Sequence, residues 1–129
     1  MEIIAKYPLL FRRYSLPMSQ TCMCWGLQIR KGWYPLMDEL CQVLQSKIDN
    51  HELEQVEFEE IKEKFGSLRI TTIPYNKEVD KLIRQTKNKA HNTCELCGNK
   101  MIKRYYIDKD DYNACCIDCY NQCITNIHP

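Results

Sequence analysis

Residues 94–119 read CELCGNKMIKRYYIDKDDYNACCIDC, and this stretch organises the C-terminal end of the chain. It begins with one Cys-x-x-Cys pair, Cys94 and Cys97, and ends with a second, Cys116 and Cys119, after eighteen intervening residues. This spacing is typical of a structural zinc site, because each turn directs two thiolates at one ion and two turns complete a tetrahedron. We therefore predict one structural Zn²⁺ per chain, held by these four cysteines.

Two further cysteines lie close to the predicted ligands. Cys115 directly precedes Cys116, and Cys123 lies about one helical turn after Cys119. If the second pair begins a helix, Cys115 faces away from the ion, and we interpret it as a small apolar packing residue. For Cys123 we leave two interpretations open: a packing residue, or a spare thiol near the metal site. His91 is a possible substitute ligand, but four thiolates already suffice.

A site of four thiolates predicts a structural role for the metal. Catalytic zinc usually keeps an open position for water, and four cysteines leave none. The His-x-Glu and Pro-Cys-x-x-Cys pattern of zinc deaminases is missing. With only four glycines, neither a P-loop nor a dinucleotide fingerprint can be written. We therefore expect no enzyme activity and no small-molecule substrate.

The residues around the cysteines predict a compact module. Gly98 follows the first pair, where a tight knuckle needs the backbone freedom of glycine. Residues 101–107 and 112–116 are strand-like, and residues 116–127 have helical periodicity. This order indicates a zinc-ribbon or treble-clef-like module at residues 93–129, packed on a domain formed by residues 1–92.

The preceding part of the chain predicts an α+β fold, with two amphipathic helices on a small antiparallel sheet. Apolar residues at three- and four-residue steps indicate one helix from Pro35 to Ile48 and another over residues 77–91, capped by Asn76. Residues 53–75 indicate two strands joined by a turn at Gly66, with a helical continuation of residues 58–65 as the alternative for the first strand. Residues 23–29 alternate and suggest a further half-buried strand.

Composition indicates a cytoplasmic protein with reduced thiols. The 129 residues include nine cysteines, an odd number, and the start of the sequence has no secretory pattern. No apolar run approaches the ~20 residues of a membrane helix, so we expect no membrane contact. Cys22 and Cys24 could join Cys41 in a second thiol cluster, but we prefer core packing for them.

Charge is distributed unevenly, although the net charge is only +1. Residues 77–104 hold eight Lys and Arg against three Asp and Glu, and Tyr105 and Tyr106 follow them. A basic surface with aromatic rings suits nucleic acid. The alternative, which we prefer, is that the basic helix complements the acidic residues 49–63 or faces solvent. The candidate partner-binding residues are Trp33, Tyr34, Lys81, Arg84, Lys87, Lys103, Arg104, Tyr105 and Tyr106.

Four motifs together resemble a family of small bacteriophage and prophage proteins. These motifs are GWYPLMDELC at residues 32–41, IKEKFGSLRI at 61–70, CELCG at 94–98 and CIDC at 116–119. The resemblance extends from about Cys22 to Cys119 and implies a phage origin and a host cytoplasm, but no activity. Cys115 and Cys123 depart from the family pattern and leave the ligand assignment slightly open.

We expect from these features a non-enzymatic phage protein that contains zinc and binds a host macromolecule. Inhibition of a bacterial defence or housekeeping protein is the leading hypothesis, with aromatic residues as anchors. The second hypothesis is a nucleic-acid-binding protein that uses the basic helix at residues 77–91 and the zinc module.

Overall fold

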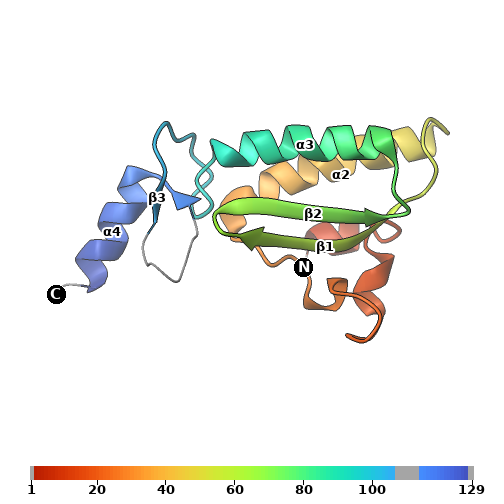
Figure 1. Cartoon of the computed structure of the whole chain (residues 1–129), viewed down its shortest axis with the longest axis horizontal. Coiled ribbons are helices and arrows are strands. Elements are labelled where there is room, and N and C mark those ends of the chain that lie inside the picture. The colour runs from red at the N-terminus through yellow and green to blue at the C-terminus, as the bar shows by residue number, and fades with distance from the viewer. Residues whose placement is uncertain (1, 107–113, 128–129) are drawn as a thin grey trace.

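The computed structural model describes residues 2–106 and 114–127, with side chains described up to residue 123. In Figure 1, α2 and α3 run side by side above a β-hairpin, and the cysteine-rich end with α4 lies at one tip of an elongated molecule. The elements in chain order are α1 (Glu2–Lys6), η1 (Arg12–Ser15), η2 (Met23–Trp25), η3 (Lys31–Trp33), α2 (Tyr34–Asp49), β1 (Glu57–Lys64), β2 (Ser67–Ile73), α3 (Lys77–His91), β3 (Tyr105–Tyr106), β4 (Ala114–Cys115) and α4 (Ile117–Ile127).

Both predicted amphipathic helices are present, and each buries the apolar stripe found in the sequence. Pro35 occupies the first turn of α2, where its missing N–H costs no helical hydrogen bond. The side chain of Asn76 caps α3 by accepting hydrogen bonds from the backbone N–H groups of Glu78 (2.9 Å) and Val79 (3.1 Å). The two helices pack on each other and cover one face of the hairpin through α3.

The predicted hairpin is also present, as an antiparallel pair of β1 and β2. Its two-residue turn consists of Phe65 and Gly66, with φ angles of 51° and 81°. Positive φ at both positions gives the turn the twist that a two-residue hairpin requires. Phe58 and Ile61 of β1 point into the main core, together with Leu68 and Ile70 of β2.

The predicted strand at residues 23–29 is wrong for its first half. Residues Met23–Trp25 form a 3₁₀ turn instead, and Gly26, at φ 73°, redirects the chain after it. Only Gln28 joins the sheet, where its N–H donates to the Ile61 carbonyl (3.0 Å) and its carbonyl accepts from Glu63 (3.0 Å). Of the four alternating apolar residues, Met23, Leu27 and Ile29 are buried, whereas Trp25 is 59 % exposed.

Residues 93–106 and 114–127, here called the cysteine module, form a separate small core. Buried Cys94, Met101, Ala114, Cys115 and Cys116 make up this core, and Tyr105 and Tyr120 pack against it. Strands β3 and β4 pair antiparallel, as expected, but each has two residues, and residues 101–104 of the predicted strand at 101–107 are not in a strand. The connecting residues 107–113 lie outside the described residues. Over the described ranges 2–106 and 114–127, the structure contains no helix long and apolar enough to cross a membrane.

Candidate metal centre

The four predicted ligands converge on one point of the cysteine module. The sulfur atoms of Cys94, Cys97, Cys116 and Cys119 all lie within 4.8 Å of one another. Cys94 Sγ is 3.8 Å from Cys119 Sγ, and Cys97 Sγ is 3.7 Å from Cys116 Sγ. A tetrahedral zinc with Zn–S bonds of about 2.3 Å requires S···S separations of about 3.8 Å. The arrangement can therefore hold a metal ion, and these separations are too long for disulfides.

Backbone N–H groups around the cysteines point at the sulfur atoms. The N–H of Cys97 donates to Cys94 Sγ (3.5 Å), the N–H of Cys116 donates to the same sulfur (3.3 Å), and the N–H of Asn99 donates to Cys97 Sγ (3.4 Å). Backbone donors of this kind, directed at the sulfur atoms, orient thiolate ligands and disperse their negative charge. Gly98, at φ 84°, lets the chain fold back within this knuckle, as the sequence predicted.

The same donors shift the ionisation of Cys94. Burial raises the pKa of this thiol, but the hydrogen bonds from Cys97 and Cys116 outweigh burial and lower the pKa to about 7. Burial raises the pKa values of Cys97 and Cys119 instead. One thiolate is therefore readily formed near neutral pH, and a bound cation would favour ionisation of the others.

The remaining cysteines lie outside the four-sulfur group. Cys115 is fully buried, and its thiol donates to the carbonyl of Tyr105 (3.5 Å), while burial raises its pKa to about 12. It is a packing residue, as expected. Cys41 lies in the main core, as expected, whereas Cys22 is exposed, so the prediction of core packing is wrong for Cys22. Among the residues that the structure describes, no group of three or more possible metal ligands includes either of them. Cys123 is half-buried and does not belong to the group.

The cysteine module is joined to the N-terminal part of the chain by a close contact between two backbones. The N–H of Gly32 donates to the carbonyl of Glu95 (2.8 Å), and the N–H of Arg30 donates to Glu95 Oε2 (3.1 Å). A Cβ on Gly32 would lie 2.3 Å from the carbonyl oxygen of Glu95 and 2.4 Å from that of Cys94. Only glycine permits this approach. We call this contact the Gly32–Glu95 seam.

Trp33 extends the seam and is fully buried. Its indole Nε1 donates to the carbonyl of Thr93 (2.9 Å), just before the first ligand Cys94. Its ring is the largest of the fully buried side chains. Trp33 is therefore not available as a surface anchor, and this part of the predicted partner-binding set is wrong. An indole with a buried hydrogen-bond partner is suited to the core.

The other predicted partner residues are spread over several surfaces. Tyr34 is half-buried beside α1, whereas Lys81, Arg84 and Lys87 are exposed on α3. Arg84 pairs with Asp80 one turn away (2.7 Å).

The four predicted partner residues of the cysteine module lie together. Lys103 Nζ is 5.5 Å from the ring centroid of Tyr105, and the Arg104 guanidinium carbon is 5.8 Å from the ring centroid of Tyr106. Arg104 also donates to the carbonyl of Gly66 in the hairpin turn.

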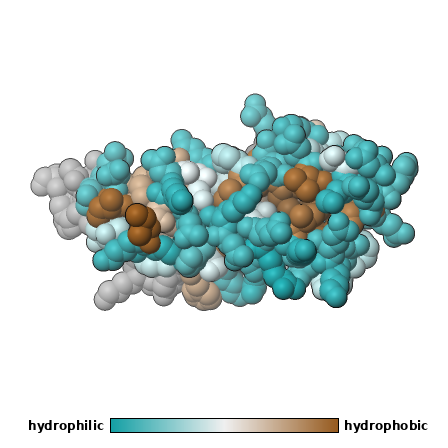
Figure 2. Space-filling view, turned by 90° about the horizontal axis from the view of Figure 1, so that it is seen from above, coloured by the Kyte–Doolittle hydropathy of each residue, from teal (hydrophilic) through white to brown (hydrophobic). Residues whose placement is uncertain are grey.

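The sequence does not predict the burial or exposure of several residues of the module. Glu95 is completely buried, although the sequence places it in a polar knuckle. Ile102 and Ile117 are exposed beside a hollow of about 360 Å³ in the module surface, lined also by Lys100, Lys103 and Tyr105. In Figure 2, hydrophobic side chains gather both over this end and over the two long helices. A helical or strand period cannot reveal such a surface, because it combines residues 99–103 with the starts of β3 and α4.

Comparison of the chain with family models, with curated proteins and with solved structures finds no match.

Proposed function

We propose that this protein is a non-enzymatic binding protein whose cysteine module is a zinc-ribbon or treble-clef-like unit with one structural Zn²⁺. The distances between the four sulfur atoms support this metal and geometry, since tetrahedral four-sulfur sites hold zinc or iron. The thiolates would occupy all four positions of the ion. The metal would then contribute to folding, on the order of 10 kcal/mol for the module, and not to catalysis.

The observation that carries a binding role is the exposed apolar surface at the module. Ile102 is fully exposed and Ile117 is 44 % exposed, and both line the hollow. Exposed apolar residues next to an aromatic ring are typical of the centre of a protein-binding surface. We propose that a protein partner covers Ile102 and Ile117 and that Lys100 and Lys103 favour an acidic surface on that partner.

Ion pairs within the chain favour a protein partner over nucleic acid. On α3, Arg84 pairs with Asp80, and Lys89 pairs with Glu39 of α2. These pairs reduce the positive field of the helix that the nucleic-acid hypothesis requires. Four thiolates around Zn²⁺ also carry a net charge of about −2, which the lysines of the module partly offset. Nucleic-acid binding is the second candidate, favoured by Lys103 and Arg104 over the two tyrosines and by the exposed Lys81 and Lys87 of α3.

The biological setting follows from the resemblance to phage proteins. We propose a phage-encoded protein that acts in the host cytoplasm and inhibits a bacterial defence or housekeeping protein. A rigid module presented by a metal suits such a task, because a pre-ordered surface loses little conformational entropy on binding.

Two measurements test this proposal. Elemental analysis of the purified protein should give about one zinc per chain, and less than about a tenth of an equivalent would contradict the metal site. Affinity capture from host lysate should recover a partner with the wild type and lose it with Ile102→Asp. The matched control is Met18→Asp, also an exposed residue but outside the module. Equal capture by both variants would exclude the module surface as the partner-binding site. Retention of oligonucleotides by the protein would favour nucleic-acid binding, the second candidate.

A further inference from the structure

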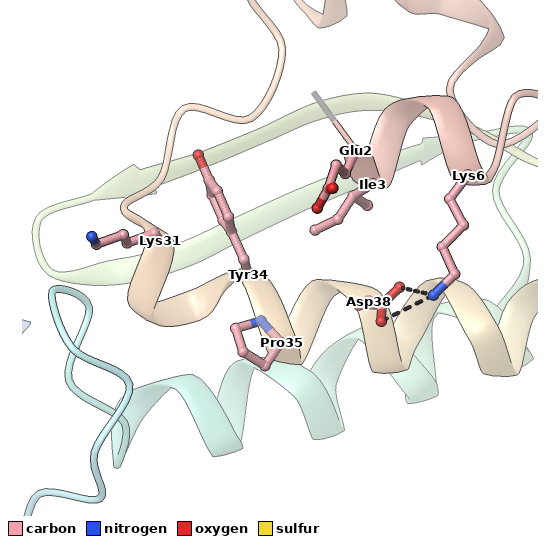
Figure 3. A pocket seen from close by; sticks show the side chains of 7 residues that line it. All are labelled: Glu2, Ile3, Lys6, Lys31, Tyr34, Pro35 and Asp38. Carbon is pink, nitrogen blue, oxygen red and sulfur yellow. Dashed lines mark hydrogen bonds and ion pairs between the residues drawn. The ribbon is translucent and has the colours of Figure 1, made fainter.

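A second hollow lies between α1 and the beginning of α2. It has a volume of about 600 Å³ and is lined by Glu2, Ile3, Lys6, Lys31, Tyr34, Pro35 and Asp38. Figure 3 shows the ring of Tyr34 standing between Lys31 on one side and Ile3 with Glu2 on the other, with Pro35 at the base. The volume lies within the range of ligand-binding pockets.

Both walls of this hollow are held in place by interactions elsewhere in the chain. On the α1 side, Lys6 Nζ and the Tyr7 hydroxyl both donate to Asp38 Oδ1, each over 3.0 Å. On the other side, Lys31 is followed directly by Gly32 and Trp33, whose hydrogen bonds to Glu95 and Thr93 fix the turn η3. The hollow is therefore formed before anything binds, which lowers the entropic cost of binding.

The charged residues that line the hollow indicate the chemistry of a ligand that could bind there. Lys6 and Asp38 form an ion pair with each other, whereas Lys31 forms no ion pair with the residues that the structure describes. Its charge adds to the positive end of the α2 dipole, and the first turn of α2 contains no acidic residue. Glu2 lies in the first turn of α1, where a carboxylate is already favourable. An occupant thus needs an apolar group between Ile3 and Tyr34 and a carboxylate near Lys31.

We propose that this hollow is an anchor site for an apolar side chain of a protein partner that has a carboxylate next to it. This inference rests on the proposed protein-binding function and adds a second contact to the one at Ile102. The occupant is a peptide segment of the type apolar–acidic, with its ring or branched side chain packed on Tyr34 and Pro35. Its carboxylate pairs with Lys31.

A minimal probe reproduces this chemistry without the partner. N-acetylphenylalanine carries one apolar ring and one carboxylate, and its primary amide is the uncharged control. Amide NMR spectra of the full zinc-loaded chain should show shifts at Ile3, Lys31 and Tyr34 on addition of the acid. The acid should bind about three-fold more tightly than the amide, as an exposed ion pair allows. Lys31→Gln should remove this preference and leave the ring contact.

Steric variants complete the test. Ile3→Trp should fill the hollow and abolish the shifts, whereas Ala5→Trp, on the same helix but not in its lining, should preserve them. If the acid shifts none of these amides at millimolar concentrations, or if inorganic phosphate produces the same shifts, the anchor site is wrong. The outcome is separable from the proposed function: capture of a partner that depends on Ile102 can succeed while the probe fails, and the reverse result would retain the anchor site alone.

Discussion

The backbone N–H of Gly32 donates to the carbonyl of Glu95 over 2.8 Å, and Glu95 directly follows the first cysteine ligand. This bond joins the residue before Trp33, near the start of the longest helix, to the knuckle that orients Cys94. The cysteine module and the helical part of the chain therefore share one structural joint. We therefore expect a substitution at the metal site to alter the stability of α2, and a substitution of Gly32 to alter the geometry of the metal site.

Substitution of a ligand should remove the metal. Cys116→Ser replaces one of four thiolates in a group whose sulfur atoms lie within 4.8 Å of one another. We expect loss of zinc binding by at least ten-fold in affinity, since a hydroxyl is a poor ligand for this ion. Cys22→Ser is the matched control, because Cys22 is exposed and outside the group. Equal metal content in both variants, measured by elemental analysis, would refute the ligand assignment.

Substitution of Gly32 should destabilise the protein by a steric mechanism. In Gly32→Ala the added Cβ would lie 2.3 Å from the Glu95 carbonyl oxygen, so the two backbones must separate. We expect a loss of at least about 1–3 kcal/mol in the free energy of unfolding, as for overpacked cores. Gln42→Ala, on an exposed position of α2, should change it by less than about 0.5 kcal/mol. Denaturant unfolding measures both, and a neutral Gly32→Ala would show that the seam is not tight.

Removal of the indole donor should weaken the same joint without a clash. Trp33→Phe keeps an aromatic ring but leaves the part-buried carbonyl of Thr93 without its 2.9 Å hydrogen bond. The expected cost is about 1–3 kcal/mol from the unsatisfied acceptor, with a further contribution from lost volume. Hydrogen exchange should show faster opening in residues 93–101 as well as in α2. Acceleration confined to α2 would mean that the indole does not connect the two parts.

Chelation should loosen the cysteine module before the rest of the chain. The module core contains Cys94, Cys115 and Cys116 but few large apolar side chains, whereas the main core contains Trp33, Phe58 and many aliphatic residues. A small core of this kind depends on its metal. We expect added EDTA to abolish hydrogen-exchange protection in α4 while β1 and β2 keep theirs. Uniform loss of protection would instead show that the whole chain requires the ion.

Acid should release α1 through Asp38. The hydrogen bond from Lys6 lowers the pKa of Asp38 below 3.8, its usual value. Because the folded state binds the proton less readily than the unfolded state, the stabilisation is complete above pH 3.8 and is lost as the pH falls through the lowered pKa. Asp38→Asn should therefore show a smaller acid dependence of unfolding than the wild type. Identical acid dependence in the two proteins would exclude this contact as a contributor.

The sequence by itself determined the two long helices, the hairpin turn at Gly66 and the identity of the four clustered cysteines. These features depend on local periods, turn chemistry and the geometry of a Cys-x-x-Cys knuckle, all of which are encoded over short distances. Asn76 illustrates the point, since its capping role follows from its place before an apolar stripe.

Only the tertiary structure decided what the residues between these features do. Trp33 resembled a surface anchor in the sequence but is buried, because Thr93, sixty residues away, provides a partner for its indole. No local pattern marks Gly32 as a contact residue, but it is the point where two backbones meet. Burial and close approach depend on which distant segments are brought together, and no local pattern of residues records that.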